Sequence, residues 1–166
     1  MNEPSYYLKR AAEIINQIRY ATLATVCEDG NPWNSPVSSQ HDDDLNIYWV
    51  SDKEGQHSRN IRHNQNVFIV IYDSTIPEGE GEGVYIQAKA YELNDRDEIL
   101  EMRKAKKGPD VDDADKFLGD GIRRMYKAVP QSVWMNDAQI EDGIFMRDVR
   151  IEVPLDELKK RLSAAK

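Results

Sequence analysis

The sequence has a single cysteine and no long apolar run. Cys27 alone cannot form an internal disulfide, and the N-terminus lacks the basic segment followed by an apolar run that marks a secretory signal. The longest apolar run, residues 67–72, is far shorter than the roughly 20 residues needed to cross a bilayer, and it has the length of a buried strand. These absences predict a cytoplasmic protein that does not span a membrane.

Basic residues are fewer than acidic residues in this sequence. The chain has 30 Asp and Glu against 22 Lys and Arg, which gives a formal net charge of -8. Such a chain repels both a phosphate backbone and an anionic membrane surface, so we expect neither nucleic acid nor membrane as a partner. A length of 166 residues suits one core, and we expect residues 1–166 to form a single domain.

Local patterns predict a mainly antiparallel β protein with peripheral helices. Alternating or continuous apolar residues bounded by turn signals predict strands over residues 20–27, 33–40, 45–51, 67–72, 84–93, 125–135 and 143–153. The first three strands should pair in sequence, and the strand at 67–72 should be central. Helical spacing occurs in residues 5–18, 56–64, 95–106, 113–124 and 155–162. Six or seven strands with short turns favour a small closed or partly open barrel, with a helical insertion at about 95–124.

Two acidic segments and one glycine-rich segment are explained without a ligand. Residues 41–44 (His-Asp-Asp-Asp) form a tight turn from which side chains diverge. In the calcium-loop-like segment 110–115, Ala114 takes a ligand position and Asp115 stands where glycine is required, so helix capping explains it better. The glutamates of residues 79–83 (Gly-Glu-Gly-Glu-Gly) would repel phosphate, which indicates a mobile hairpin loop. We therefore predict no metal site.

The polar segment 51–60 is the strongest candidate for binding a ligand. It runs from the end of a strand into the start of a helix, where free backbone N–H groups attract anions. A serine hydroxyl and the side chains of His57 and Arg59 can help surround a phosphate there. An ordinary capped surface helix is the alternative. Cys27 has no identified base nearby, and no serine lies in a Gly-x-Ser-x-Gly turn, so covalent catalysis has little support.

Several short motifs occur in a characteristic order between residues 18 and 93. They are Ala-Thr-Leu-Ala-Thr-Val at 21–26, Asp-Gly-Asn-Pro at 29–32, Pro-Val at 36–37, Leu-Asn-Ile-Tyr-Trp-Val-Ser at 45–51, His-Ser-Arg-Asn-Ile at 57–61 and Asn-Val at 66–67. In this order the chain resembles the FMN-binding split-barrel proteins related to pyridoxamine 5′-phosphate oxidase. The resemblance implies a split β-barrel with flavin mononucleotide (FMN) held between the two subunits of a homodimer.

The resemblance also implies where the flavin lies. Its phosphate is expected at the strand end and the helix that follows, near Val50, Ser51, His57, Ser58, Arg59 and Asn60. The ring is expected beside the second strand, where proline fits because it cannot donate a ladder hydrogen bond. The ring candidates are Asn34, Ser35, Pro36, Val37, Gln87 and Trp134, the last reaching from the partner subunit, although core packing is an equal alternative for this tryptophan.

Departures from the true oxidases narrow the expected function. Ser35, Gln40 and His57 align with an arginine and two lysines that help bind the phosphate in those enzymes, and their C-terminal Trp and Arg-Leu motif is absent. We therefore expect an FMN-dependent oxidoreductase that acts on another small molecule, with the acidic region 107–121 shaping a different pocket. The alternatives are a non-catalytic flavin- or heme-binding carrier or sensor, and a deazaflavin-dependent reductase of the same fold.

Overall fold

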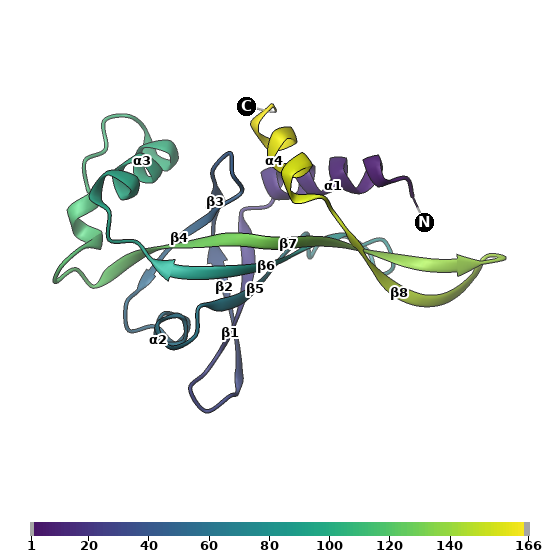
Figure 1. Cartoon of the computed structure of the whole chain (residues 1–166), viewed down its shortest axis with the longest axis horizontal. Coiled ribbons are helices and arrows are strands. Elements are labelled where there is room, and N and C mark those ends of the chain that lie inside the picture. Colours follow the sequence, from purple (N-terminus) through teal and green to yellow (C-terminus); the bar gives the residue numbers. More distant parts are fainter. Residues whose placement is uncertain (1, 165–166) are drawn as a thin grey trace.

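A computed structural model describes residues 2–164, and within them the chain forms one antiparallel sheet of eight strands and four α-helices (Figure 1). The strands are β1 (Tyr20–Val26), β2 (Pro32–Ser38), β3 (Gln40–His41), β4 (Ile47–Asp52), β5 (Asn66–Tyr72), β6 (Gly83–Glu92), β7 (Arg123–Glu141) and β8 (Ile144–Glu152). The helices are α1 (Pro4–Gln17), α2 (Gln56–His63), α3 (Arg96–Lys107), α4 (Leu155–Ser163) and the short 3-10 helix η1 (Ala114–Phe117). This confirms the mainly β, split-barrel fold, and the sheet is open rather than closed.

The strand order is β2-β1-β5-β6-β7-β4-β3, and β8 pairs with β7 outside this path. β1 and β2 form the predicted hairpin, and β5 is central, between β1 and β6. The segment predicted as one strand over 33–40 is interrupted at Ser39, whose N–H bonds to the carbonyl of Arg19 (3.0 Å). The two residues of β3 then pair with β4, so β2 and β3 lie at opposite ends of the strand order. The expected pairing of three consecutive strands is wrong for β2 because the chain crosses between the two ends.

The larger core lies on the inner face of the sheet. Every second residue of the central strands points inward, and Ile69 and Ile86 are almost completely buried. The apolar stripe of α1 and that of α4 cover this face, with Ala11 of α1 and Leu158 of α4 fully buried. Burial of apolar surface at these positions is the main stabilising contribution to the fold.

A smaller core holds the insertion on the other face. Tyr48 and Met125 point away from the inner core and pack with Ile99 of α3 and Phe117 of η1. The helical prediction for 95–106 matches α3, whose N-cap Asp95 accepts the N–H groups of residues 97 and 98. The prediction for 113–124 is wrong beyond η1, because two glycines turn the chain at 119–121 and β7 begins directly afterwards.

The β7–β8 hairpin extends past the rest of the sheet (Figure 1). β7 has 19 residues, and its turn into β8 places Asp142 and Gly143 in left-handed backbone conformations. Near the turn, Ile144 and Phe145 leave more than half of their side-chain surface in solvent. None of the helices within residues 2–164 is long and apolar enough to cross a membrane.

Candidate functional site

The first turn of α2 lies against the edge strand β2. His57 Nδ1 is 3.2 Å from the hydroxyl oxygen of Ser35, so a predicted phosphate residue and a predicted ring residue are in direct contact. The first helical hydrogen bond runs from the N–H of Arg59 to the carbonyl of Gly55, which leaves the N–H groups of residues 56–58 free for an anion. Ser35 pairs with the buried Leu23, so this contact ties the helix start to the inner side of the edge strand.

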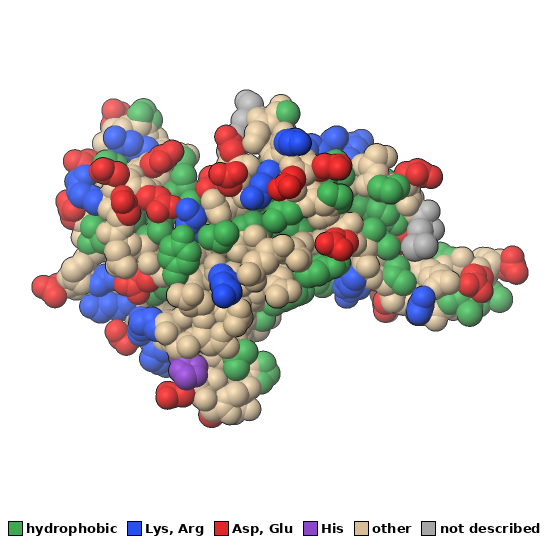
Figure 2. Space-filling view, viewed as in Figure 1, with side chains coloured by type: hydrophobic (Ala, Val, Ile, Leu, Met, Phe, Trp, Pro, Cys, Tyr) green, Lys and Arg blue, Asp and Glu red, His purple; other side chains and the backbone are tan. Residues whose placement is uncertain are grey.

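The guanidinium of Arg59 is held over this turn. It donates to the carbonyl of Glu54 and, from Nη2, to the side chain of Gln56 (2.6 Å). Arg59 is exposed, and these two hydrogen bonds leave further guanidinium N–H groups available to a ligand. Figure 2 shows Lys and Arg side chains gathered around α2, whereas acidic side chains dominate the surface over α3. The local charge favours an anion although the whole chain is negative.

Two other predicted phosphate residues are buried and use their polar atoms inside the chain. Ser58 Oγ donates to the carbonyl of Asp52 (2.7 Å). Asn60 Nδ2 donates to Thr25 Oγ1 (2.9 Å), and its Oδ1 accepts from Gln56 (2.8 Å). These bonds fasten α2 to β1 and to the end of β4, and so they set the position of the helix start.

The imidazole of His57 is half-buried. Its burial lowers the pKa, because a buried imidazolium loses hydration. The ring meets Tyr126 edge-on, with centroids 6.5 Å apart, and Tyr126 stacks on Trp49. His57 Nε2, Tyr126 Oη and Trp49 Nε1 are buried without a hydrogen-bond partner among the described residues. The packing beneath the helix start therefore has unused hydrogen-bonding capacity.

The remaining predicted residues lie on different faces of the sheet. Ser51 shares the inner side with Trp49, Val37 is buried in the inner core, and Val50 packs against the insertion. Asn34 and Pro36 pair with Ala24 and Thr22 of β1, and so they lie on the outer face. Gln87 pairs with Phe68 on that face, and Trp134 stacks on the same phenylalanine ring (6.3 Å, 19°). The α3–η1 insertion covers only the β4 end of the outer face.

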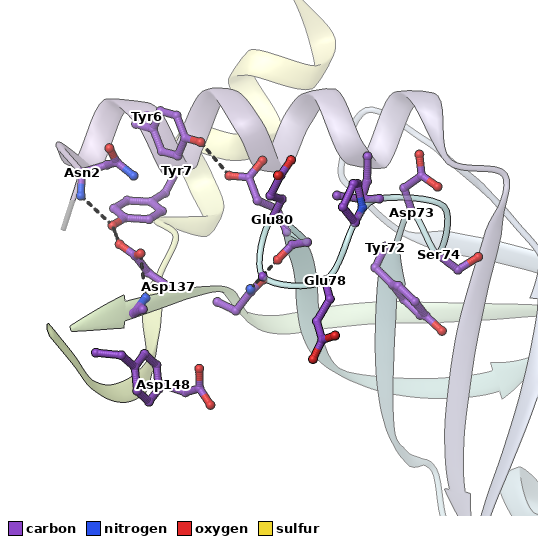
Figure 3. Close-up of a pocket in the computed structure, with 18 residues that line it drawn as sticks. Asn2, Tyr6, Tyr7, Tyr72, Asp73, Ser74, Glu78, Glu80, Asp137 and Asp148 are labelled. Carbon is purple, nitrogen blue, oxygen red and sulfur yellow. Dashed lines mark hydrogen bonds between the residues drawn. The ribbon is translucent and has the colours of Figure 1, made fainter. Parts of the chain in front are cut away.

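A cavity of about 740 Å³ lies away from all twelve predicted residues (Figure 3). It is bordered by the start of α1, the loop from Asp73 to Glu82 and the β7–β8 hairpin. Residues 79–82 of the Gly-Glu-Gly-Glu-Gly segment, which the sequence predicts to be a mobile hairpin loop, belong to its lining. Within residues 2–164, no group of His, Cys, Asp and Glu side chains is placed to hold a metal ion.

The sequence matches the family described as pyridoxamine 5′-phosphate oxidase over residues 8–140, which includes β1 to β6, the whole insertion and all but the last residue of β7. The chain belongs to this family. No curated protein sequence matches it. The family assignment agrees with the order of motifs between residues 18 and 93 and extends it to α1 and β7.

Solved structures share the fold at low sequence identity. A candidate pyridoxamine 5′-phosphate oxidase from Listeria innocua is 21% identical over 76% of this chain and 94% of its own, with a TM-score of 0.56. A candidate 5-nitroimidazole antibiotic resistance protein from Bacteroides thetaiotaomicron is 18% identical over 76% and 81%, with a TM-score of 0.61. The heme storage protein of Vibrio cholerae is 16% identical over 75% and 91%, also at 0.61. At these identities the likeness concerns the fold alone.

Proposed function

We propose that this member of the pyridoxamine 5′-phosphate oxidase family binds FMN and acts as an oxidoreductase on a small molecule. The observation that carries the proposal is the contact between His57 and Ser35, which joins the start of α2 to an open strand edge. An FMN molecule needs both an anion site and a polar edge that can bond to its ring. Both features lie next to each other in this chain.

The phosphate is assigned to the first turn of α2. The free N–H groups of residues 56–58 and the guanidinium of Arg59 supply donors that suit a dianion. Ser51 lies at the end of β4, just before the turn that leads into the helix, and is half-buried. Ser58 and Asn60 are assigned to holding the helix start in place, since their polar atoms are already bonded within the chain.

The ring is assigned to the outer face beside β2. Within residues 2–164, β2 pairs with β1 alone, so its other edge offers backbone donors and acceptors to a ligand. Asn34 and Pro36 flank that edge, and Gln87 and Trp134 lie farther along the face. The bound flavin would supply the capacity to accept or donate a hydride, while these residues orient it and exclude water.

The bare part of the outer face supports a homodimer. Phe68 is 38% exposed in the middle of the sheet, and Tyr20, Tyr72 and Val129 are also exposed on strands of this sheet. Exposed apolar surface of this kind favours association, and a two-fold axis would bring the same face of a second subunit against it. A partner subunit placed there would cover a flavin bound on the face.

The test is the absorbance spectrum of the purified protein, together with the mass of any small molecule released on denaturation. Bound FMN, and an apoprotein that binds FMN more tightly than riboflavin, would support the proposal. Release of heme or of a deazaflavin instead would show that the protein binds one of those cofactors, and it would overturn the proposal. Light scattering at micromolar concentration should give a dimer, and tight FMN binding by a strict monomer would contradict the shared site.

A further inference from the structure

The cavity of about 740 Å³ has an acidic lining. Six carboxylates border it, and none of its lining residues is basic (Figure 3). Three are already engaged, because Glu82 pairs with Arg10 (2.7 Å), Asp137 accepts a hydrogen bond from Tyr7 and Asp73 accepts one from the hydroxyl of Thr75 (2.7 Å). The six carboxylates are Asp73, Glu78, Glu80, Glu82, Asp137 and Asp148.

Three of these carboxylates have no counter-charge. The side chains of Glu78, Glu80 and Asp148 make no hydrogen bond or ion pair within residues 2–164. They come from two separate segments, the loop after β5 and the outer part of β8, which the fold brings to one cavity. Gathering like charges around one hollow raises the local concentration of cations.

Four aromatic rings also line the cavity, beside small, amide and aliphatic residues. Tyr6 and Tyr7 of α1 meet edge-on (5.6 Å, 87°), and Tyr72 and Phe145 approach from β5 and β8. An aromatic face attracts an organic cation, and apolar ring surface also buries the carbon skeleton that carries the charge. A small hydrated metal ion would gain little from such walls, whereas an organic ammonium ion uses both the rings and the carboxylates.

The cavity leads toward the face assigned to the flavin. A neighbouring hollow of about 230 Å³ shares Tyr72 and Asp73 with it and is also lined by Val70 and Tyr85. Tyr85 pairs with Trp134 across the sheet and lies 6.5 Å, ring to ring, from Phe68. The acidic cavity and the outer face are thus joined along one line of side chains.

We propose that this cavity binds a small organic cation, an amine or quaternary ammonium compound without phosphate or carboxylate groups. If the protein is the proposed flavin-dependent oxidoreductase, on which this step rests, such a cation is its class of substrate. The carboxylates attract the ammonium group, the tyrosines and Phe145 contact its carbon skeleton, and an anionic compound is repelled.

Three probes of similar shape and different charge test the proposal on the full-length protein: benzylammonium, benzyl alcohol and benzoate. Binding is measured by calorimetry and by ligand-observed NMR, with and without FMN. Benzylammonium should bind at least about tenfold more tightly than benzyl alcohol, and benzoate should not bind. Equal binding of all three, or binding of none, overturns the proposal.

Charge-neutralising variants locate the site. Glu80→Gln combined with Asp148→Asn should weaken benzylammonium about fivefold or more, and added salt should weaken it in the wild type. The control Glu101→Gln removes an exposed carboxylate from α3, far from the cavity, and should change nothing. An unchanged affinity in the double variant removes the cavity as the site.

The cation site and the flavin site can fail separately. If the protein selects cations but does not bind FMN, the cation site is supported and the flavin proposal is rejected. If the protein binds FMN but does not select cations, the flavin proposal is supported and the cation site is rejected.

Discussion

The rings of Phe68 and Trp134 stack on the outer face of the sheet, with centroids 6.3 Å apart and planes 19° from parallel. Two large side chains from β5 and β7 are thus fixed against each other across the intervening strand β6, although neither belongs to the core. Core packing, one of the two explanations for Trp134, does not apply within the single chain. The pair forms a rigid aromatic surface that is open to a ligand or a second subunit.

Trp134→Ala should weaken FMN and riboflavin equally, by about 1–3 kcal/mol, because stacking acts on the ring that both ligands share. Trp134→Phe keeps an aromatic face and should lose less. Flavin fluorescence titrations of the apoprotein measure both affinities. A loss confined to FMN would place this tryptophan near the phosphate and contradict the assignment to the ring.

Arg59→Ala should weaken FMN by about 1.5–3 kcal/mol and leave riboflavin almost unaffected, since only FMN carries the phosphate that a guanidinium would bind. The matched control is Arg62→Ala on the same helix, where the guanidinium bonds to the carbonyl of Lys53 and faces Glu54 and Glu92. Equal losses for both flavins in Arg59→Ala, or none, would remove Arg59 from the phosphate site.

The half-buried imidazole of His57 should make stability depend on pH. Its pKa is lowered by burial, so between that value and the ordinary value of about 6.5 the unfolded chain binds a proton that the folded chain does not. The free energy of unfolding should therefore fall as the pH drops below about 6.5 and be insensitive to this group above it. Urea denaturation between pH 5 and 8 measures the slope.

Two variants isolate this histidine. His57→Gln retains a hydrogen-bonding group beside Ser35 and should reduce the slope between pH 5 and 6.5. The exposed His63 lies on the same helix, and His63→Gln should keep the slope of the wild type. If His57→Gln leaves the slope unchanged, another group is responsible for it.

Gly121→Ala should destabilise the protein by about 1–3 kcal/mol, the usual cost of overpacking. A Cβ at Gly121 would overlap the backbone carbonyl oxygens of Lys116 and Leu118, which belong to the same tight turn. Gly81→Ala is the control, because a Cβ there meets nothing within 4 Å and the backbone needs no left-handed conformation. Thermal unfolding compares the two, and equal melting temperatures would show that the turn relaxes without cost.

Strand periodicity predicted most of the sheet, because alternation of buried and exposed residues is a local property. In β6, Ile86 and Ala88 are buried and Gln87 is exposed, as the pattern required. The break at Ser39 was not visible, since residues 33–40 keep β-favouring composition while the chain changes its pairing partner from β1 to β4. Pairing partners depend on the whole sheet, and a single strand does not encode them.

The candidate site, like the fold, was only partly predictable from the sequence. The motif around His57 identified the helix start, and the contact with Ser35 was not deducible because 22 residues separate the two positions. The acidic cavity was missed because its lining comes from α1, the loop after β5 and the β7–β8 hairpin, three segments that are far apart in sequence. No local pattern marks a hollow built from such distant pieces.

The length of β7 governs the order in which the chain can fold. This strand pairs with β4 at its start, with β6 along its middle and with β8 at its end. Within residues 2–164, β4 pairs only with β7 and with the two-residue β3. Its main partner, β7, is synthesised about 70 residues later, so β4 cannot pair fully before then. During synthesis the β1–β2 hairpin can form early, whereas Trp49 reaches its stacked position on Tyr126 only when β7 has left the ribosome. The last third of the chain thus completes both the sheet and the packing around His57.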